Sequence, residues 1–199
     1  RGQAGRVTPP PDDTIGAERL RRLRMVVAAA AIAAPILHSI TDAMEWAGHG
    51  FSDRQLWLNY VAFAPMPWLL LGLYAVHTPE LGTPALTGAL LHGVAFTYFS
   101  HTTLLALFEQ VPSYEALWDR LGATYTIHGA FMVAGGLSFA VAAWRARRLP
   151  RLAVGLFAAG LAVNLALALV PAPDILQTLG TTIRNAGLVG MGVSLWRTR

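Results

Sequence analysis

Long apolar stretches alternate with short polar segments along almost the whole chain. Six of these stretches reach the roughly 20 residues that a helix needs to cross the hydrocarbon core of a bilayer. They cover residues 25–46, 56–76, 86–107, 123–144, 152–170 and 175–196. None shows the alternation of apolar and polar positions that is typical of strands in a membrane barrel. The pattern therefore predicts an all-α integral membrane protein, a bundle of six transmembrane helices.

The chain begins with the polar, proline-rich segment RGQAGRVTPPPDDTIG, a composition typical of disordered tails. We therefore expect a disordered polar N-terminal tail over residues 1–20 and a six-helix transmembrane domain over residues 21–199.

Composition agrees with this class and excludes several kinds of chemistry. Of the 199 residues, 54% are hydrophobic and 13% are charged, whereas about a quarter of the residues in a soluble domain are charged. The absence of cysteine excludes disulfides, thiolate metal sites and cysteine nucleophiles. Lysine is absent too, which excludes a lysine Schiff base.

The arginines cluster at alternate ends of the apolar stretches. Four lie within residues 19–24, directly before the first stretch, four lie between the fourth and fifth, and two follow the sixth. With six spans, all ten fall on one side of the membrane. Because positively charged residues favour the cytoplasmic side, we expect both termini to be cytoplasmic and the protein to be a multi-pass protein of the plasma (inner) membrane. The net charge of +4 is thereby explained without a nucleic-acid partner.

Ionisable residues mark the outer half of the first stretch. His38, Asp42, Glu45 and His49 follow one another at intervals of four, three and four residues, which places them on one narrow face of a helix that turns about 100° per residue. An ionisable side chain within a membrane span is costly unless it faces protein or water. We therefore expect this face to point into the bundle.

Other stretches place their polar residues at a similar depth. Candidates are Tyr98, His101, Tyr125, His128, Asn164 and Gln177 toward the outer half, and Arg184 near the centre of its span. This shared depth predicts a polar pocket that opens toward the outer leaflet above an apolar floor. We expect Tyr98, Tyr125, Asn164 and Gln177 to bind a substrate there.

The candidate residues suit metal or acid–base chemistry. His38 and Asp42, one helical turn apart, would join His101 and His128 as ligands of zinc or iron, since imidazole and carboxylate suit both metals. Haem b, held by two histidines, is the alternative cofactor. Whether the enzyme uses a metal or not, its catalytic groups would be Asp42, Glu45 and Arg184.

The sequence leaves the function open between several classes. The principal hypothesis is a membrane enzyme or cofactor-binding protein that acts on a lipophilic or small-molecule substrate and is surrounded by membrane lipids. A proton-coupled transporter of a small solute is one alternative, because protonatable groups lie in the outer half. A non-catalytic subunit of an oligomer or larger complex is the other.

Overall fold

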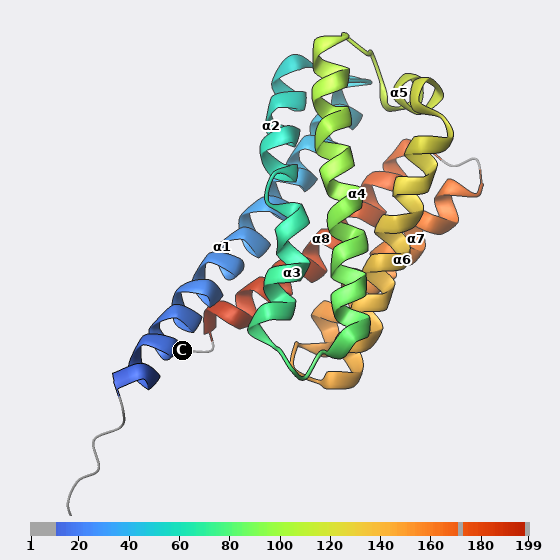
Figure 1. Ribbon diagram of the computed structural model, residues 1–199. Helices are drawn as coiled ribbons and strands as arrows, with labels where there is room; N and C mark the ends of the chain where they lie inside the picture. The colour runs from blue at the N-terminus through green and yellow to red at the C-terminus, as the bar shows by residue number, and fades with distance from the viewer. Residues whose placement is uncertain (1–10, 171–172, 198–199) are drawn as a thin grey trace, which may run out of the picture.

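The polypeptide forms six long helical rods that alternate in direction (Figure 1). The computed structural model describes residues 11–170 and 173–197, and within these residues all regular structure is helical. The eight helices are α1 (Pro11–Gly48), α2 (Asp53–Phe63), α3 (Met66–Val76), α4 (Gly82–Phe108), α5 (Tyr114–Leu121), α6 (Ala123–Ala146), α7 (Arg151–Ala168) and α8 (Asp174–Arg197). Helix α1 begins at Pro11, so residues 11–20 of the expected tail are helical, and residues 1–10 lie outside the described part.

Four helical segments are long and apolar enough to cross a membrane. They are Ile15–Gly48, Asp53–Val76, Ala123–Ala146 and Arg151–Ala168. The remaining two rods, α4 with 27 residues and α8 with 24, have enough length but are not among these four segments. The all-helical fold expected from the sequence is therefore confirmed for the described residues, and four of its helical segments have the length and apolarity that a membrane crossing requires.

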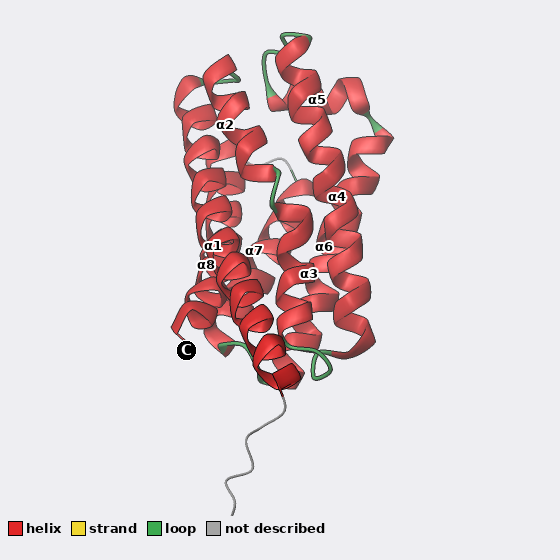
Figure 2. Cartoon of the chain, turned by 60° about the vertical axis from the view of Figure 1, so that its left-hand side comes forward, coloured by secondary structure: helices red, strands yellow, loops and turns green. Residues whose placement is uncertain are grey.

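Neighbouring rods pack in a closed ring. In order around the bundle, α1 contacts α2 and α3, these contact α4, α4 contacts α6, α6 contacts α7, and α7 contacts α8, which returns to α1 (Figure 2). Helix α5 is a short cap beside the start of α6. The described ends of the chain, in α1 and α8, lie at the same end of the bundle, which we call the arginine end because it also holds the α6–α7 connection.

Glycine permits the closest approaches within this ring. A methyl group added at Gly187 of α8 would lie 2.6 Å from the carbonyl oxygen of Ala153 and would also overlap the backbone of Phe157, both on α7. Gly88 of α4 and Gly135 of α6 approach in the same way, with each carbonyl oxygen 2.5–2.7 Å from the position of the other's missing methyl. Small residues thus allow backbone-to-backbone packing of membrane helices.

The second rod is interrupted where the sequence contains two prolines. Helix α2 ends at Phe63 and α3 begins at Met66, with Pro65 at the junction. Pro65 and Pro67 have no N–H group, so the carbonyl groups of Val61 and Phe63 lack their usual helical donors. The interruption therefore follows directly from the sequence APMP.

An ion pair joins the two connections at the arginine end. Arg148, just after α6, donates to Glu80, between α3 and α4, at 2.7 Å. The α3–α4 connection contains no arginine of its own. The ion pair places an arginine of the α6–α7 connection beside the α3–α4 connection.

Candidate functional site

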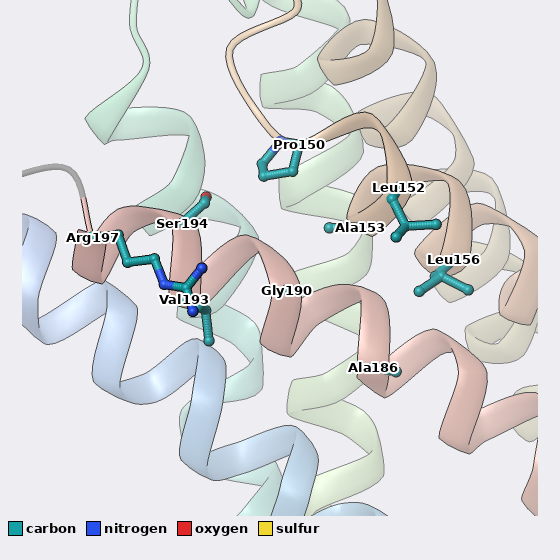
Figure 3. A pocket seen from close by; sticks show the side chains of 9 residues that line it. All are labelled: Pro150, Leu152, Ala153, Leu156, Ala186, Gly190, Val193, Ser194 and Arg197. Atoms are coloured by element: carbon teal, nitrogen blue, oxygen red, sulfur yellow. The ribbon is translucent and has the colours of Figure 1, made fainter.

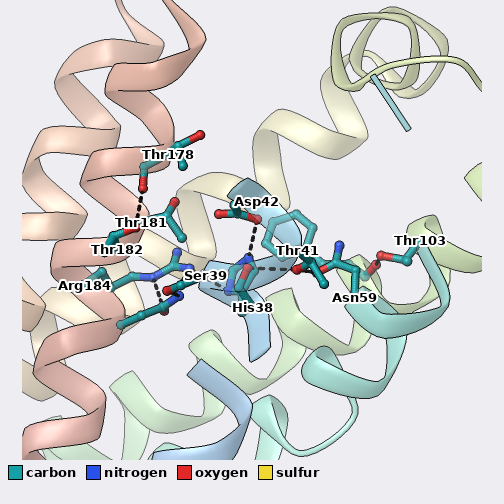
Figure 4. Close-up of polar contacts among 12 residues, drawn as sticks. His38, Ser39, Thr41, Asp42, Asn59, Thr103, Thr178, Thr181, Thr182 and Arg184 are labelled. Atoms are coloured by element: carbon teal, nitrogen blue, oxygen red, sulfur yellow. Dashed lines mark hydrogen bonds and ion pairs between the residues drawn. The ribbon is translucent and has the colours of Figure 1, made fainter. Parts of the chain in front are cut away.

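Polar side chains of α1 and α8 meet within the bundle (Figure 4). His38 Nε2 lies 3.3 Å from Asp42 Oδ1, one turn further along α1. His38 Nδ1 lies 3.2 Å from a terminal guanidinium nitrogen of Arg184 on α8. His38 is 6% exposed and Arg184 is 3% exposed, whereas the Asp42 side chain keeps 19% of its surface accessible. Asp42 is therefore the accessible end of a buried chain of three groups.

The hydrogen bonds determine which nitrogen of His38 carries the proton. A guanidinium group has donors and no acceptor, so Arg184 donates to Nδ1 and that nitrogen is unprotonated. A neutral imidazole then has its proton on Nε2, which faces the Asp42 carboxylate. Two aromatic rings hold the imidazole edge-on, Phe63 at 4.7 Å and Phe96 at 6.4 Å between ring centroids.

Further contacts fix the Arg184 guanidinium. It donates from Nε to Asn185 Oδ1 at 3.4 Å and from a terminal nitrogen to the Met132 sulfur at 3.2 Å, and its centre lies 5.7 Å from the Phe96 ring. Asn185 in turn donates to Ser39 Oγ of α1 at 3.0 Å. Helices α1 and α8 are thus joined by two polar contacts one residue apart.

Two smaller contacts extend this arrangement to neighbouring helices. Thr41 Oγ1 lies 3.1 Å from Asn59 Oδ1 of α2, and it also lies 2.8 Å from the carbonyl oxygen of His38. Asn164 of α7 donates to Thr181 Oγ1 of α8 at 3.0 Å. Gln177 lies one turn before Thr181 on α8 and is half-buried.

Aromatic side chains of α4, α5 and α6 pack against one another. His128 stacks on Tyr98 with 3.8 Å between ring centroids, and Tyr125 lies 6.4 Å from Tyr98. Tyr125 also lies 5.7 Å from Tyr114 of α5. We call Tyr98, Tyr114, Tyr125 and His128 the aromatic wall.

The negative charges of Glu45 and Asp42 on α1 affect the pKa of Tyr114 in the aromatic wall. Desolvation raises the pKa of the Tyr114 phenol to about 12, and the negative charges of Glu45 and Asp42 add to the increase. The interaction of Tyr114 with Tyr125 opposes that increase. Although 44% of Tyr114 is exposed, its phenol is kept neutral at physiological pH.

The metal site expected from the sequence is not supported. Within the described residues, no group of three or more histidine, aspartate and glutamate side chains is placed to hold a metal ion. His38 and Asp42 do meet, but His101 is exposed on α4. His128 is engaged elsewhere, because its Nδ1 lies 2.7 Å from the Thr124 carbonyl oxygen and its ring stacks on Tyr98.

The remaining predicted residues are partly brought together. Asp42 and Arg184 belong to the α1–α8 network, and Glu45 is half-buried one turn beyond Asp42. Sequence reasoning missed Ser39, Thr41, Asn59, Met132 and Asn185. Ser39, Thr41 and Asn185 lie within three residues of predicted site residues in the sequence, so proximity to those residues was the available signal.

A buried histidine outside the network has no polar contact. His92 of α4 is 1% exposed, and neither of its ring nitrogens has a hydrogen-bond partner among the described residues. Its ring lies 4.7 Å from Phe96 and 6.1 Å from Phe157. His92 therefore packs among aromatic side chains of the apolar core.

Comparison with known proteins gives no relationship to report. No protein-family model, no curated protein and no solved structure matches the chain.

Proposed function

We propose that this chain is a six-span protein of the plasma (inner) membrane that performs acid–base chemistry on a small or lipophilic substrate, with Asp42 as the proton acceptor. The observation that supports the proposal is the chain of contacts from Arg184 through His38 to Asp42. His38 lies between the Arg184 guanidinium and the Asp42 carboxylate and contacts both of them. Asp42 alone among the three keeps an appreciable accessible surface.

The aromatic wall supplies the complementary group. The Tyr114 phenol, whose pKa is raised to about 12, is protonated at physiological pH as an ordinary phenol is, so it is able to donate a hydrogen bond to an oxygen of the substrate. Asp42 would remove a proton from the substrate while Tyr114 or Tyr125 stabilises the negative charge that develops on that oxygen. Glu45, half-buried on the same face of α1, would exchange the proton with water.

Deuterium incorporation tests this reaction even while the substrate is unidentified. Membranes containing the protein are incubated in D₂O with an extract of small molecules and lipids, and mass spectrometry records compounds that gain deuterium at carbon. We expect incorporation that depends on the wild-type protein, is lost in Asp42→Asn and persists in the control Asp119→Asn, which alters an exposed carboxylate on α5. Equal incorporation by Asp42→Asn, or none by the wild type, contradicts the assignment of Asp42.

Six membrane crossings are supported by the alternating rods and by the clustering of arginines at one end. Because the chain has no cysteine, single cysteines provide an unambiguous test. We expect Thr83→Cys, at the start of α4, and Asp119→Cys, beyond its end, to react with an impermeant maleimide from opposite sides of the membrane. Pro173→Cys and Arg197→Cys, at the two ends of α8, should do the same. Labelling of either pair from one side shows that the helix between them does not cross.

Proton-coupled transport of a small solute is the second candidate function. The observation that favours it is His92, a buried imidazole without a polar contact on the arginine side of the network. In proteoliposomes, a transporter would show solute-dependent proton uptake that both Asp42→Asn and His92→Leu abolish. Uptake equal to that of empty liposomes eliminates this alternative.

A further inference from the structure

A groove lies between α7 and α8 near the arginine end (Figure 3). It has a volume of about 440 Å³ and is lined by Pro150, Leu152, Ala153, Leu156, Ala186, Gly190, Val193, Ser194 and Arg197. Leu152 is 76% exposed, and Ala186 is exposed as well. In a membrane, this surface faces the acyl chains of the surrounding leaflet.

The shape of the groove follows from the packing of α7 on α8. Gly187 brings the two backbones together, and the adjoining positions Ala153, Ala186 and Gly190 have minimal side chains, which leaves a shallow floor. Leu152 and Leu156 line the α7 side, and Val193 lines the α8 side. The surface is therefore apolar and elongated along the helices.

Charge is present only at one end of this groove. Arg197 is the single charged residue in the lining, and it has no ion-pair partner in the part of the chain that the structure describes. Arg151 adjoins Leu152 at the start of α7, with its guanidinium 5.6 Å from the Trp144 ring. Acidic side chains do not contribute to the lining.

We infer that the α7–α8 groove binds a phospholipid with an anionic headgroup. One acyl chain lies along the apolar floor, and the phosphate is bound by Arg197. Arginines at a membrane interface attract anionic lipids, and the groove provides the apolar surface that such a lipid needs. The inference rests on the six-span arrangement under "Proposed function" and is independent of the reaction at Asp42.

A second groove offers a matched comparison. It lies between α4 and α6, near the same end, and has a volume of about 570 Å³. Its lining includes Glu80 and Arg145, and Glu80 is paired with Arg148 at 2.7 Å. The lining of the α7–α8 groove has no such carboxylate among the described residues, so the α4–α6 groove differs from it in this respect and serves as the control surface.

Competition between two lipids tests the inference. The full chain, purified in dodecyl maltoside and delipidated, is mixed with equal amounts of phosphatidylglycerol and phosphatidylcholine, and native mass spectrometry counts the bound lipids. We expect an approximately fivefold preference for phosphatidylglycerol, the ratio that corresponds to the ~1 kcal/mol contributed by one arginine near an anionic surface. Arg197→Gln should remove this preference, and Ala186→Leu, which fills the groove, should remove binding of both lipids there.

Control variants separate this result from the other proposals. Ala142→Leu fills the α4–α6 groove and should leave the phosphatidylglycerol preference unchanged. Asp42→Asn should also retain it, even though the same variant abolishes the proposed acid–base activity. Equal retention of the two lipids by the wild type overturns the inference, as does an unchanged preference in Arg197→Gln.

Discussion

Removal of Asp42 and removal of Arg184 should have unequal effects on stability, although the two residues belong to one network. Arg184 is 3% exposed and cannot lose its proton under ordinary conditions. The Asp42 side chain is 19% exposed, so a carboxylate left alone there is able to contact water or bind a proton. Asp42→Asn therefore leaves a buried uncompensated cation, whereas Arg184→Met does not.

The magnitudes follow from the contacts. Breaking a buried ion pair by removing one partner costs about 3–5 kcal/mol. Because His38 lies between Asp42 and Arg184, we expect the lower value, about 3 kcal/mol, for Asp42→Asn. Arg184→Met loses hydrogen bonds to His38 and Asn185, worth roughly 1 kcal/mol each, but it also removes the cost of burying the guanidinium. We expect a net loss of about 1 kcal/mol.

A double-mutant cycle provides the assay. The free energy of unfolding is measured in mixed micelles of dodecyl maltoside and sodium dodecyl sulfate, with helix content followed by circular dichroism. The double variant Asp42→Asn, Arg184→Met should be more stable than Asp42→Asn alone, because no unpaired cation remains. Additive losses in the cycle, or a larger loss for Arg184→Met than for Asp42→Asn, would refute the coupling.

Two further predictions concern packing and a buried polar group, and the same unfolding measurement checks both. Gly187→Ala should destabilise the protein by about 1–3 kcal/mol, because the added methyl meets the backbone of α7. Gly129→Ala, whose methyl meets nothing within 4 Å, should be neutral or stabilising. His92→Leu should stabilise by about 1–3 kcal/mol, because it removes two buried ring nitrogens without hydrogen-bond partners; in the control His128→Leu, a contact to the Thr124 carbonyl is lost instead. Equal changes in the free energy of unfolding for the two glycine variants would contradict the packing argument. Equal changes for the two histidine variants would contradict the argument from unpartnered ring nitrogens.

The helical class was predictable, and so were the ends of the rods except for the start of α1 at Pro11, because membrane insertion imposes strong requirements on the sequence. Backbone groups in hydrocarbon must be paired internally, so long apolar stretches form helices. The interruption of the second rod at Pro65 was likewise foreseeable, because proline lacks the donor. The sequence prediction of six crossings and of cytoplasmic termini remains a prediction, since four segments meet the requirement for a span by length and apolarity.

The candidate site was predictable on one helix and less so between helices. The spacing of His38 and Asp42 places them one turn apart, and the structure confirms their contact. Which residues meet across helices depends on the rotation of each rod about its axis, and the sequence does not determine this. His101 and His128 illustrate the difference, because suitable depth alone did not bring either imidazole to His38.

The interruption at Pro65 divides the second rod into two segments that make different contacts. Helix α3 contributes Leu69, Leu70 and Leu73 to the core, whereas α2 carries Asn59 and Phe63, which contact Thr41 and His38. The surroundings of the His38 imidazole therefore depend on the placement of an 11-residue segment, whose helical hydrogen bonds do not continue unbroken into α3.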